Sequence, residues 1–245
     1  MLLSQAVGLV LALGIALLRG EPLPAGPDVI VVAVAGVLGG IGITALYRGL
    51  AVGRMGIVAP VTGVLAAVIP VSAGIVLEGW PAPLVLVGIG LAIAAVLLVS
   101  RVADEGAGAS GLREALIAGV AIGLFGVAIA QLSEGIVFSS LTLIRSIQAT
   151  LVMALVIGTR SAWRLDRRAI PGVVAVGVLD MTGNACYLLA VQSGALAVAS
   201  VLSSLYPVTT VILAAVVLRE RVTRDHGVGI VLAAVAIVCI GIGNA

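Results

Sequence analysis

The sequence has few charged residues, no lysine and few aromatic side chains. Charged residues make up 10% and aromatic residues 3% of the 245 positions, and all 13 basic residues are arginines. A soluble domain carries about 25% charged residues, so this composition leaves no room for a water-soluble catalytic domain. The net charge of +2 is also too small to indicate nucleic-acid binding.

Side chains for metal binding and nucleophilic catalysis are equally scarce. Cys186 and Cys239 fall inside apolar runs, where cysteine behaves as a small apolar filler. The single histidine, His226, lies in an arginine-rich loop without ligand-like neighbours. No zinc-protease HExxH motif and no Walker A motif is present. We therefore expect no enzyme, no metal site, no cofactor and no direct use of ATP.

Hydrophobic residues, in contrast, make up 62% of the chain, and the mean hydropathy is +1.32. The apolar runs are long enough to cross a bilayer, in which only helices and closed barrels satisfy the backbone. The length of these runs favours helices over barrel strands. The sequence therefore predicts an all-α polytopic membrane protein with about nine transmembrane helices, at residues 2–18, 29–50, 55–78, 83–100, 112–133, 135–158, 169–192, 195–218 and 227–244.

Two halves of the chain resemble each other on either side of a linker-like stretch at 101–111. Each half holds a Tyr, an Ala-Val pair, a Pro-Val step and a terminal Glu. Pro207 stands in the second half where Pro70 stands in the first, and Glu220 stands where Glu78 does. We interpret the match as a duplication, with an incomplete repeat of four helices at 1–100 and a repeat of five at 112–245.

A repeat of five helices crosses the membrane an odd number of times, so its two copies run in opposite directions, as in many secondary transporters. The first half has only four helices, and an apolar run begins directly at Met1. We therefore expect the first helix of a ten-helix fold to be missing. Glycines four residues apart, at Gly36/Gly40 and Gly119/Gly123, also predict close contacts between helices.

The second half resembles a known family. Residues 177–241 contain a Tyr-x-x-Ala-x-x-x-Gly piece, a Ser-Ser-Leu-Tyr-Pro-Val step and a terminal Arg-Glu-Arg. These motifs resemble the EamA-type (RhaT-like) family of the drug/metabolite transporter superfamily. The resemblance implies ten helices in two five-helix repeats around a central cavity. It also implies export or exchange of small organic metabolites by a multi-pass protein of the cell membrane, here a bacterial inner membrane.

Two charged residues, Arg145 and Asp180, fall at the centres of predicted helices. A charge at the bilayer centre costs about 2.5–3.5 kcal/mol even on the more lenient scale. We therefore expect both to face the bundle or a water-filled cavity, where they can pair. The pair is either a substrate or proton site or a structural ion pair between two helices.

Further polar residues share these faces. Asn184 and Tyr187 follow Asp180 on one helical stripe, and Gln148 lies three positions after Arg145. Tyr47 matches Tyr187 through the repeat and is expected on the opposite wall. The predicted substrate-binding residues are thus Arg145, Asp180, Asn184, Tyr187, Gln148 and Tyr47.

The arginines in the loops are distributed unevenly. Counted alternately, the loops on one side of the membrane hold ten arginines, and those on the other hold essentially Arg19 alone. The positive-inside rule makes the rich side cytoplasmic, with Met1 inside and Ala245 outside. The family resemblance implies the reverse for both termini, so the orientation stays open.

The leading functional hypothesis is a secondary transporter that exports amino acids, drugs or similar metabolites by alternating access, with protons as a possible coupling ion. Its partners are a small-molecule substrate and the lipid bilayer, without nucleic acid. A membrane-embedded enzyme is disfavoured because the chain has so few reactive side chains. The alternative is a non-transporting membrane partner subunit or an inactive truncated fragment.

Overall fold

A computed structural model of the chain describes residues 2–52, 55–99, 111–159, 167–194, 196–204 and 224–243. Within these ranges the regular structure is entirely helical, with nine α-helices, one short 3-10 helix (η1) and no strand. This confirms the predicted all-α class. The helices are α1 (Leu2–Arg19), α2 (Pro27–Val52), α3 (Met55–Glu78), α4 (Pro83–Val99), α5 (Leu112–Ile129), α6 (Val137–Gly158), η1 (Arg167–Ala169), α7 (Ile170–Ser193), α8 (Leu196–Ser204) and α10 (Arg224–Gly243).

Six of these helices are long and apolar enough to cross a membrane, namely α1, α2, α3, α5, α6 and α7. Shorter apolar segments at Pro83–Ala95 and Gly227–Ile240 lie in α4 and α10. A polytopic membrane protein is therefore confirmed. The predicted helix at 195–218 is described only as far as Ser204, and Pro207 and Glu220 lie outside the described residues.

Local chemistry accounts for two helix ends, and a third end departs from the predicted bounds. Pro27 opens α2, a position that needs no amide hydrogen, and Gly79 ends α3 with a φ of +94°. The predicted helix at 112–133, however, ends at Ile129. The backbone N–H of Ser133 instead donates to Asp28 Oδ1 at 3.1 Å. This tertiary contact, which the sequence does not reveal, accompanies a turn in place of the last helical residues.

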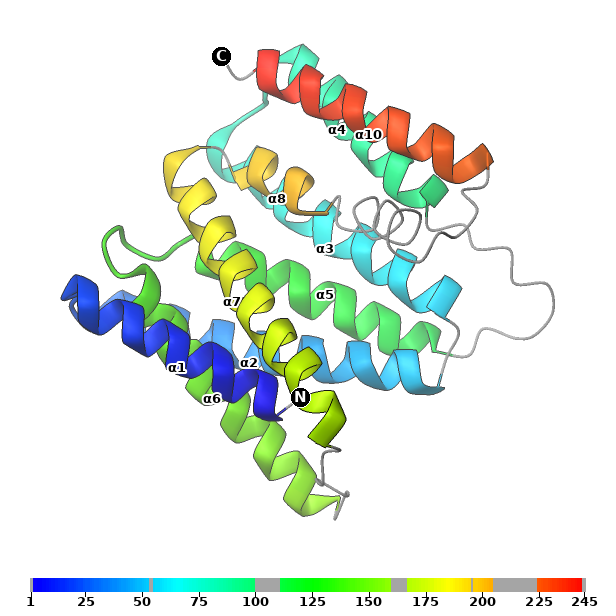
Figure 1. Cartoon of the computed structure of the whole chain (residues 1–245). Coiled ribbons are helices and arrows are strands. Elements are labelled where there is room, and N and C mark those ends of the chain that lie inside the picture. Colours follow the sequence, from blue (N-terminus) through cyan, green and yellow to red (C-terminus); the bar gives the residue numbers. More distant parts are fainter. Residues whose placement is uncertain are drawn as a thin grey trace. The chain divides into compact units, whose positions relative to one another are not determined.

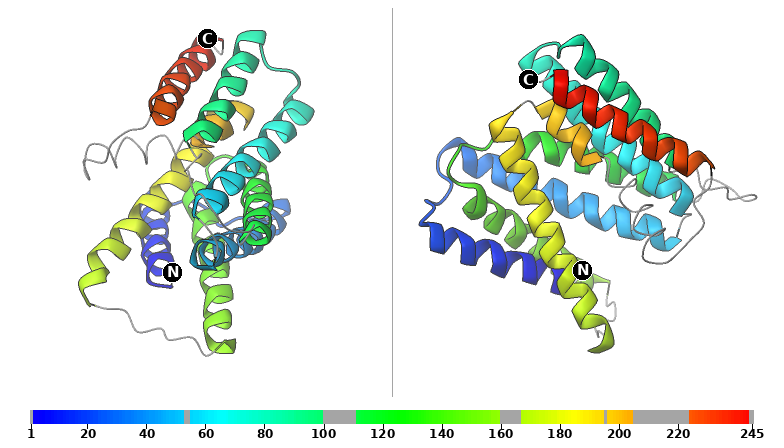
Figure 2. Two further views of the ribbon diagram at one scale, coloured as in Figure 1. Left: turned by 90° about the vertical axis from the view of Figure 1, so that its right-hand side faces the viewer. Right: turned by 45° about the horizontal axis from the view of Figure 1, so that its top comes forward.

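The described chain divides into two compact units. The first comprises residues 1–44 and 125–193, and in it α1 packs along both α6 and α7 (Figures 1 and 2). Its core contains Leu141 and Ile144 of α6 together with Met181 and Leu188 of α7. This unit holds both charged residues predicted at mid-membrane.

Glu21 organises the start of α6 within the first unit. Its Oε2 accepts hydrogen bonds from the backbone N–H groups of Phe138 at 2.7 Å and Ser139 at 3.0 Å. Its Oε1 lies 3.2 Å from Arg19 Nε, and the Arg19 guanidinium lies 5.7 Å from the Phe138 ring centroid. A negative carboxylate thus satisfies orphan donors at the positive end of a helix.

The second unit comprises residues 45–124 and 194–245, in which α3 packs on α8 and α4 packs on α10 (Figure 1). A Cβ at Gly88 of α4 would lie 2.7 Å from Ile240, and one at Gly243 of α10 would lie 2.8 Å from Val85. The order of these contacts makes α4 and α10 antiparallel. The Glu78 carboxylate accepts from the N–H of Leu196 at 3.0 Å and so caps α8.

The predicted glycine contacts are present. A Cβ at Gly36 or Gly40 would lie 2.8 Å from a side chain of α6, and one at Gly119 or Gly123 would lie 2.6–2.8 Å from a side chain of α3. The helices can approach this closely because glycine has no side chain. Both units draw helices from both halves of the chain, so the boundary between repeats at 101–111 remains a sequence prediction.

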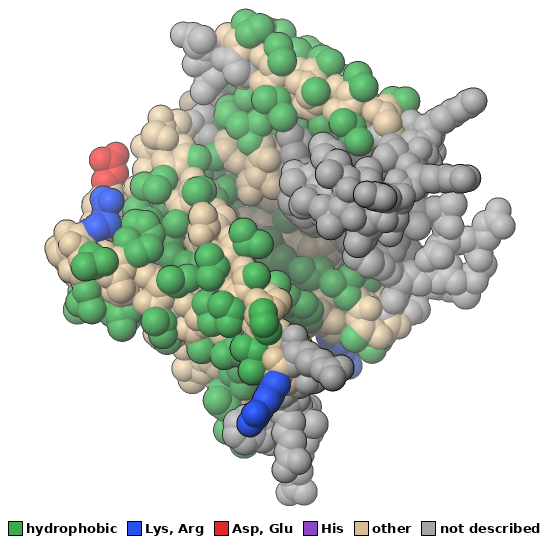
Figure 3. All heavy atoms as spheres, viewed as in Figure 1, with side chains coloured by type: hydrophobic (Ala, Val, Ile, Leu, Met, Phe, Trp, Pro, Cys, Tyr) green, Lys and Arg blue, Asp and Glu red, His purple; other side chains and the backbone are tan. Residues whose placement is uncertain are grey.

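Hydrophobic side chains dominate the surface of the described helices that faces the viewer in Figure 3. Large apolar side chains are among the most exposed in the described residues, including Leu17 on α1 at 73% and Leu179 on α7 at 71%. In water such exposure is unfavourable, whereas lipid covers it without cost.

Candidate functional site

Arg145 lies near the middle of α6, and its side chain is only 5% exposed. The buried Leu141 and Ile144 precede it on the same helix. A buried guanidinium requires an opposite charge or several acceptors, because removal of an ion from water costs several kcal/mol. The neighbouring helices α1 and α7 supply both.

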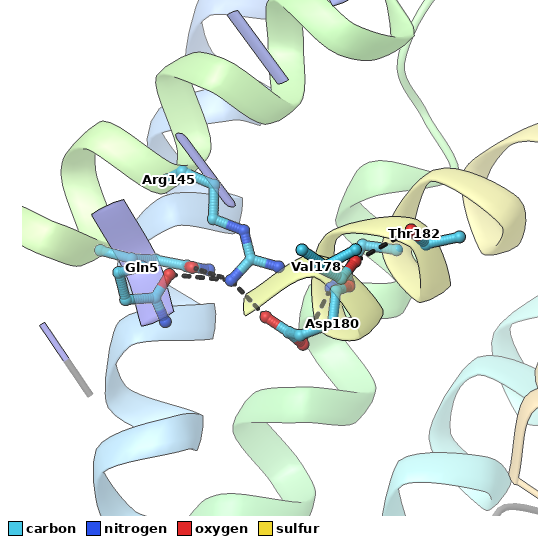
Figure 4. Close-up of polar contacts among 7 residues, drawn as sticks. Gln5, Arg145, Val178, Asp180 and Thr182 are labelled. Atoms are coloured by element: carbon cyan, nitrogen blue, oxygen red, sulfur yellow. Dashed lines mark hydrogen bonds and ion pairs between the residues drawn. The ribbon is translucent and has the colours of Figure 1, made fainter. Parts of the chain in front are cut away.

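Asp180 of α7 provides the opposite charge, as the sequence predicted. Its Oδ2 lies 2.6 Å from Arg145 Nη1, within the range of a strong charge-assisted hydrogen bond (Figure 4). The two partners differ in exposure, because the Asp180 side chain is 44% exposed. The pair therefore combines a buried cation with a carboxylate that remains accessible.

Two amides complete the environment of the guanidinium. Gln5 Oε1 of α1 accepts from Arg145 Nη1 at 2.8 Å, and Gln148 Oε1 accepts from the same atom at 3.4 Å. Both glutamines are 5% exposed. Together with Asp180, they give Arg145 acceptors on three helices, α1, α6 and α7.

Asn184 acts on Asp180 rather than on Arg145. Its Nδ2 donates to the backbone carbonyl of Asp180 at 2.8 Å and to Asp180 Oδ1 at 3.3 Å. One carboxylate oxygen therefore contacts Asn184 and the other contacts Arg145. This arrangement orients the carboxylate, so Asn184 serves as a positioning residue for the pair.

Gln148 and Tyr187 both face glycines of other helices. A Cβ at Gly39 of α2 would overlap the Gln148 amide, and one at Gly126 of α5 would lie 3.0 Å from the Tyr187 hydroxyl oxygen. Tyr187 lies on the Asp180 stripe, as its spacing predicts, but its hydroxyl is directed to α5. Tyr47 is 44% exposed and belongs to the second unit, so its place on an opposite wall stays a prediction.

Gln5 is not among the residues predicted from the sequence. A neutral amide near the start of an apolar run lacks the burial cost of a charge at mid-helix, so nothing comparable indicated it. A signal was nevertheless present in the sequence. The sequence separation between Gln5 and Arg145 is close to the separations between the repeat-related pairs Pro70/Pro207 and Glu78/Glu220. Under the predicted duplication Gln5 and Arg145 are equivalent positions, and in the structure their side chains are in contact.

The arrangement places a buried guanidinium beside a carboxylate that is 44% exposed. No nucleophile lies beside a base in these contacts, and the described residues contain no group of three or more His, Cys, Asp or Glu that could hold a metal ion. What the cluster offers is a fixed guanidinium beside an accessible carboxylate.

Comparisons with known proteins identify a family and a similar fold. Residues 110–242, more than half of the chain, match the EamA-like transporter family. A solved structure, described only as the crystal structure of a protein, superposes with a TM-score of 0.80 at 17% identity, over 99% of this chain and 86% of that one. At this identity the match concerns the fold alone. No functionally curated protein matches the chain.

Proposed function

The chain belongs to the EamA-like transporter family, and from this premise we propose that it is a secondary transporter that exports small organic metabolites such as amino acids or drugs. We place it in a cell membrane, the bacterial inner membrane. The family consists of transporters and not of enzymes. The substrate class and the direction of transport do not follow from family membership and are part of our proposal.

The observation that carries the proposal is the ion pair between Arg145 and Asp180 near the middle of two spans. A carboxylate that is 44% exposed halfway along a transmembrane helix is costly if it faces lipid. A water-filled cavity removes this cost and is also what a transported solute needs. Asp180 is in addition a group that could carry a coupling proton.

The contacts around two glycines support alternating access by inverted repeats. A Cβ at Gly36 would lie 2.8 Å from Ile147, and one at Gly177 would lie 2.9 Å from the Cβ of Val7. The sequence separation between Gly36 and Gly177 nearly equals the separation between Val7 and Ile147. The second contact is therefore the first with the two halves of the chain exchanged, as expected for a pseudo-two-fold axis.

Uptake into proteoliposomes tests the proposal. Purified protein should move at least one compound of a panel of amino acids, nucleosides and cationic drugs, and Arg145→Gln or Asp180→Asn should reduce the initial rate at least about tenfold. Arg113→Gln is the matched control, because it neutralises an exposed arginine at the start of α5. Folded protein that moves no compound would favour the partner-subunit alternative. Normal uptake by Arg145→Gln would remove the pair from the site.

A further inference from the structure

The contacts of Arg145 are all on one side of its guanidinium. Gln5, Gln148 and Asp180 each approach Nη1, and the dashed lines at Arg145 in Figure 4 meet at that atom. Among the described residues, no hydrogen bond to Nε or Nη2 accompanies them. The guanidinium is thus anchored through one nitrogen and keeps the donors of the other two.

The two remaining nitrogens form the edge of the guanidinium best suited to a carboxylate. Nε–H and Nη2–H point the same way in a rigid plane, with a spacing that matches the two oxygens of a carboxylate. Such bidentate pairs combine strength with geometric specificity. We propose that this edge of Arg145 binds the carboxylate of the transported solute. The inference rests on the proposed function.

Charge balance narrows the solute class. Arg145 and Asp180 are neutral as a pair, so a simple anion would leave one uncompensated negative charge in a buried site, which is costly. A zwitterion brings its own cation, and the accessible Asp180 carboxylate is the acceptor that an ammonium group requires. The site therefore favours amino carboxylates, of which α-amino acids are the compact case, over simple carboxylates and simple cations.

Gly8 of α1 lies beside Nε, one of the two nitrogens of this edge. A Cβ at Gly8 would lie 3.6 Å from Arg145 Nε, 3.7 Å from Arg145 Cδ and 3.7 Å from the Gly177 carbonyl oxygen. These are ordinary van der Waals distances, so Gly8→Ala adds a methyl group beside Nε without displacing its neighbours. The variant should obstruct the edge while the protein stays folded.

Ligand-induced thermal stabilisation of the full chain in detergent tests the inference, with uptake as a second readout. α-Amino acids should raise the melting temperature, whereas their methyl esters and the matching acids without an amino group should not. Arg145→Lys keeps the positive charge but lacks the planar pair of N–H donors, so it should weaken amino-acid binding at least about tenfold. Stabilisation by the esters or by the deaminated acids would overturn the inference.

The glycines of α1 provide the matched pair of variants. Gly8→Ala should weaken amino-acid binding, while Gly14→Ala, whose added Cβ meets nothing within 4 Å, should not. Equal binding by both variants would contradict a role for the Nε side. Stabilisation by amino acids without uptake would contradict the proposed function and support this inference. Uptake of cationic drugs that is unaffected by Arg145→Lys would support the proposed function and contradict this inference.

Discussion

Gln5 of α1 accepts a hydrogen bond of 2.8 Å from Arg145 of α6, although more than half of the chain separates them. Both side chains are almost fully buried. The contact joins the first helix of the chain to the helix that carries the charge, and it holds the guanidinium at Nη1. Gln5 is therefore expected to affect both the stability and the binding geometry of the site.

The replacement Gln5→Met keeps the length of the side chain and removes the acceptor. A hydrogen bond to a charged group is worth about 1.5–3 kcal/mol, so the free energy of unfolding should fall by that order. Chemical unfolding in mild detergent measures the change. Leu13→Met, at an exposed position on the same helix, should have no such effect, and equal stability of both variants would contradict the role given to Gln5.

The contact between Gly36 and Ile147 predicts an overpacking defect that can be repaired. Gly36→Ala places a Cβ 2.8 Å from Ile147 Cβ, which should cost about 1–3 kcal/mol. The clashing atoms include Ile147 Cβ, which alanine would keep, so the double variant Gly36→Ala/Ile147→Gly is needed to remove it and should recover part of the melting temperature that Gly36→Ala loses. If the double variant loses at least as much stability as the two single variants lose together, the two residues do not meet as described.

Gly177→Ala should be destabilising without such a repair. The atom nearest to the added Cβ is the backbone oxygen of Ser4, at 2.7 Å, and Val7 Cβ follows at 2.9 Å. Val7→Ala removes only part of the clash, so the melting temperature of the double variant should stay low. Gly183→Ala, on the same helix with nothing within 4 Å, serves as the control and should melt like the unaltered protein.

Glu21→Gln tests the cap on α6. The neutral amide keeps one acceptor but loses the charge that favours the positive end of a helix, so stability should fall by about 0.5–2 kcal/mol. Thermal unfolding followed by helical circular dichroism measures the loss. Glu134→Gln, an exposed glutamate in the connection before α6, should change little. A comparable loss from both variants would point to net charge rather than to the cap.

Accessibility of single cysteines decides the orientation in the membrane. In a chain with Cys186 and Cys239 replaced by alanine, Leu23→Cys should react with an impermeant maleimide in intact cells, because the arginine count places that loop outside. Leu23 is 73% exposed, so its access to reagent is not limiting. Arg113→Cys should react only after the cells are opened. The reverse pattern would establish the orientation implied by the family resemblance.

The helices were largely predictable, because apolar length and local end signals determine them. The segment 55–78 has the predicted bounds, with Gly79 in the left-handed conformation directly after it. The end of α5 was not predicted, and a hydrogen bond to Asp28, a residue from a different part of the chain, accompanies the turn that follows it. Local signals account for an end such as that of α3, whereas tertiary contacts such as the one to Asp28 are not visible in the sequence.

The site was predictable to the extent that it is charged. Arg145 and Asp180 are conspicuous in an apolar sequence because burial of a single charge is so costly. Pairing of the two charges reduces this cost, so their contact could be expected. The amide of Gln5 is cheaper to bury, so no comparable argument selects it. Helical spacing also placed Tyr187 correctly on its stripe, but it could not reveal that Gly126 of α5 leaves room for its hydroxyl.

The residue before α6, Ile136, makes no side-chain hydrogen bond to the start of the helix, and Glu21 takes over that task from a distant, earlier part of the chain. This order suits the direction of synthesis, because chains emerge from the N-terminal end first. The acceptor already exists when α6 is made. The first turn of α6 can thus form against a finished partner, and of the described α-helices in the first unit only α7 is then still to be added.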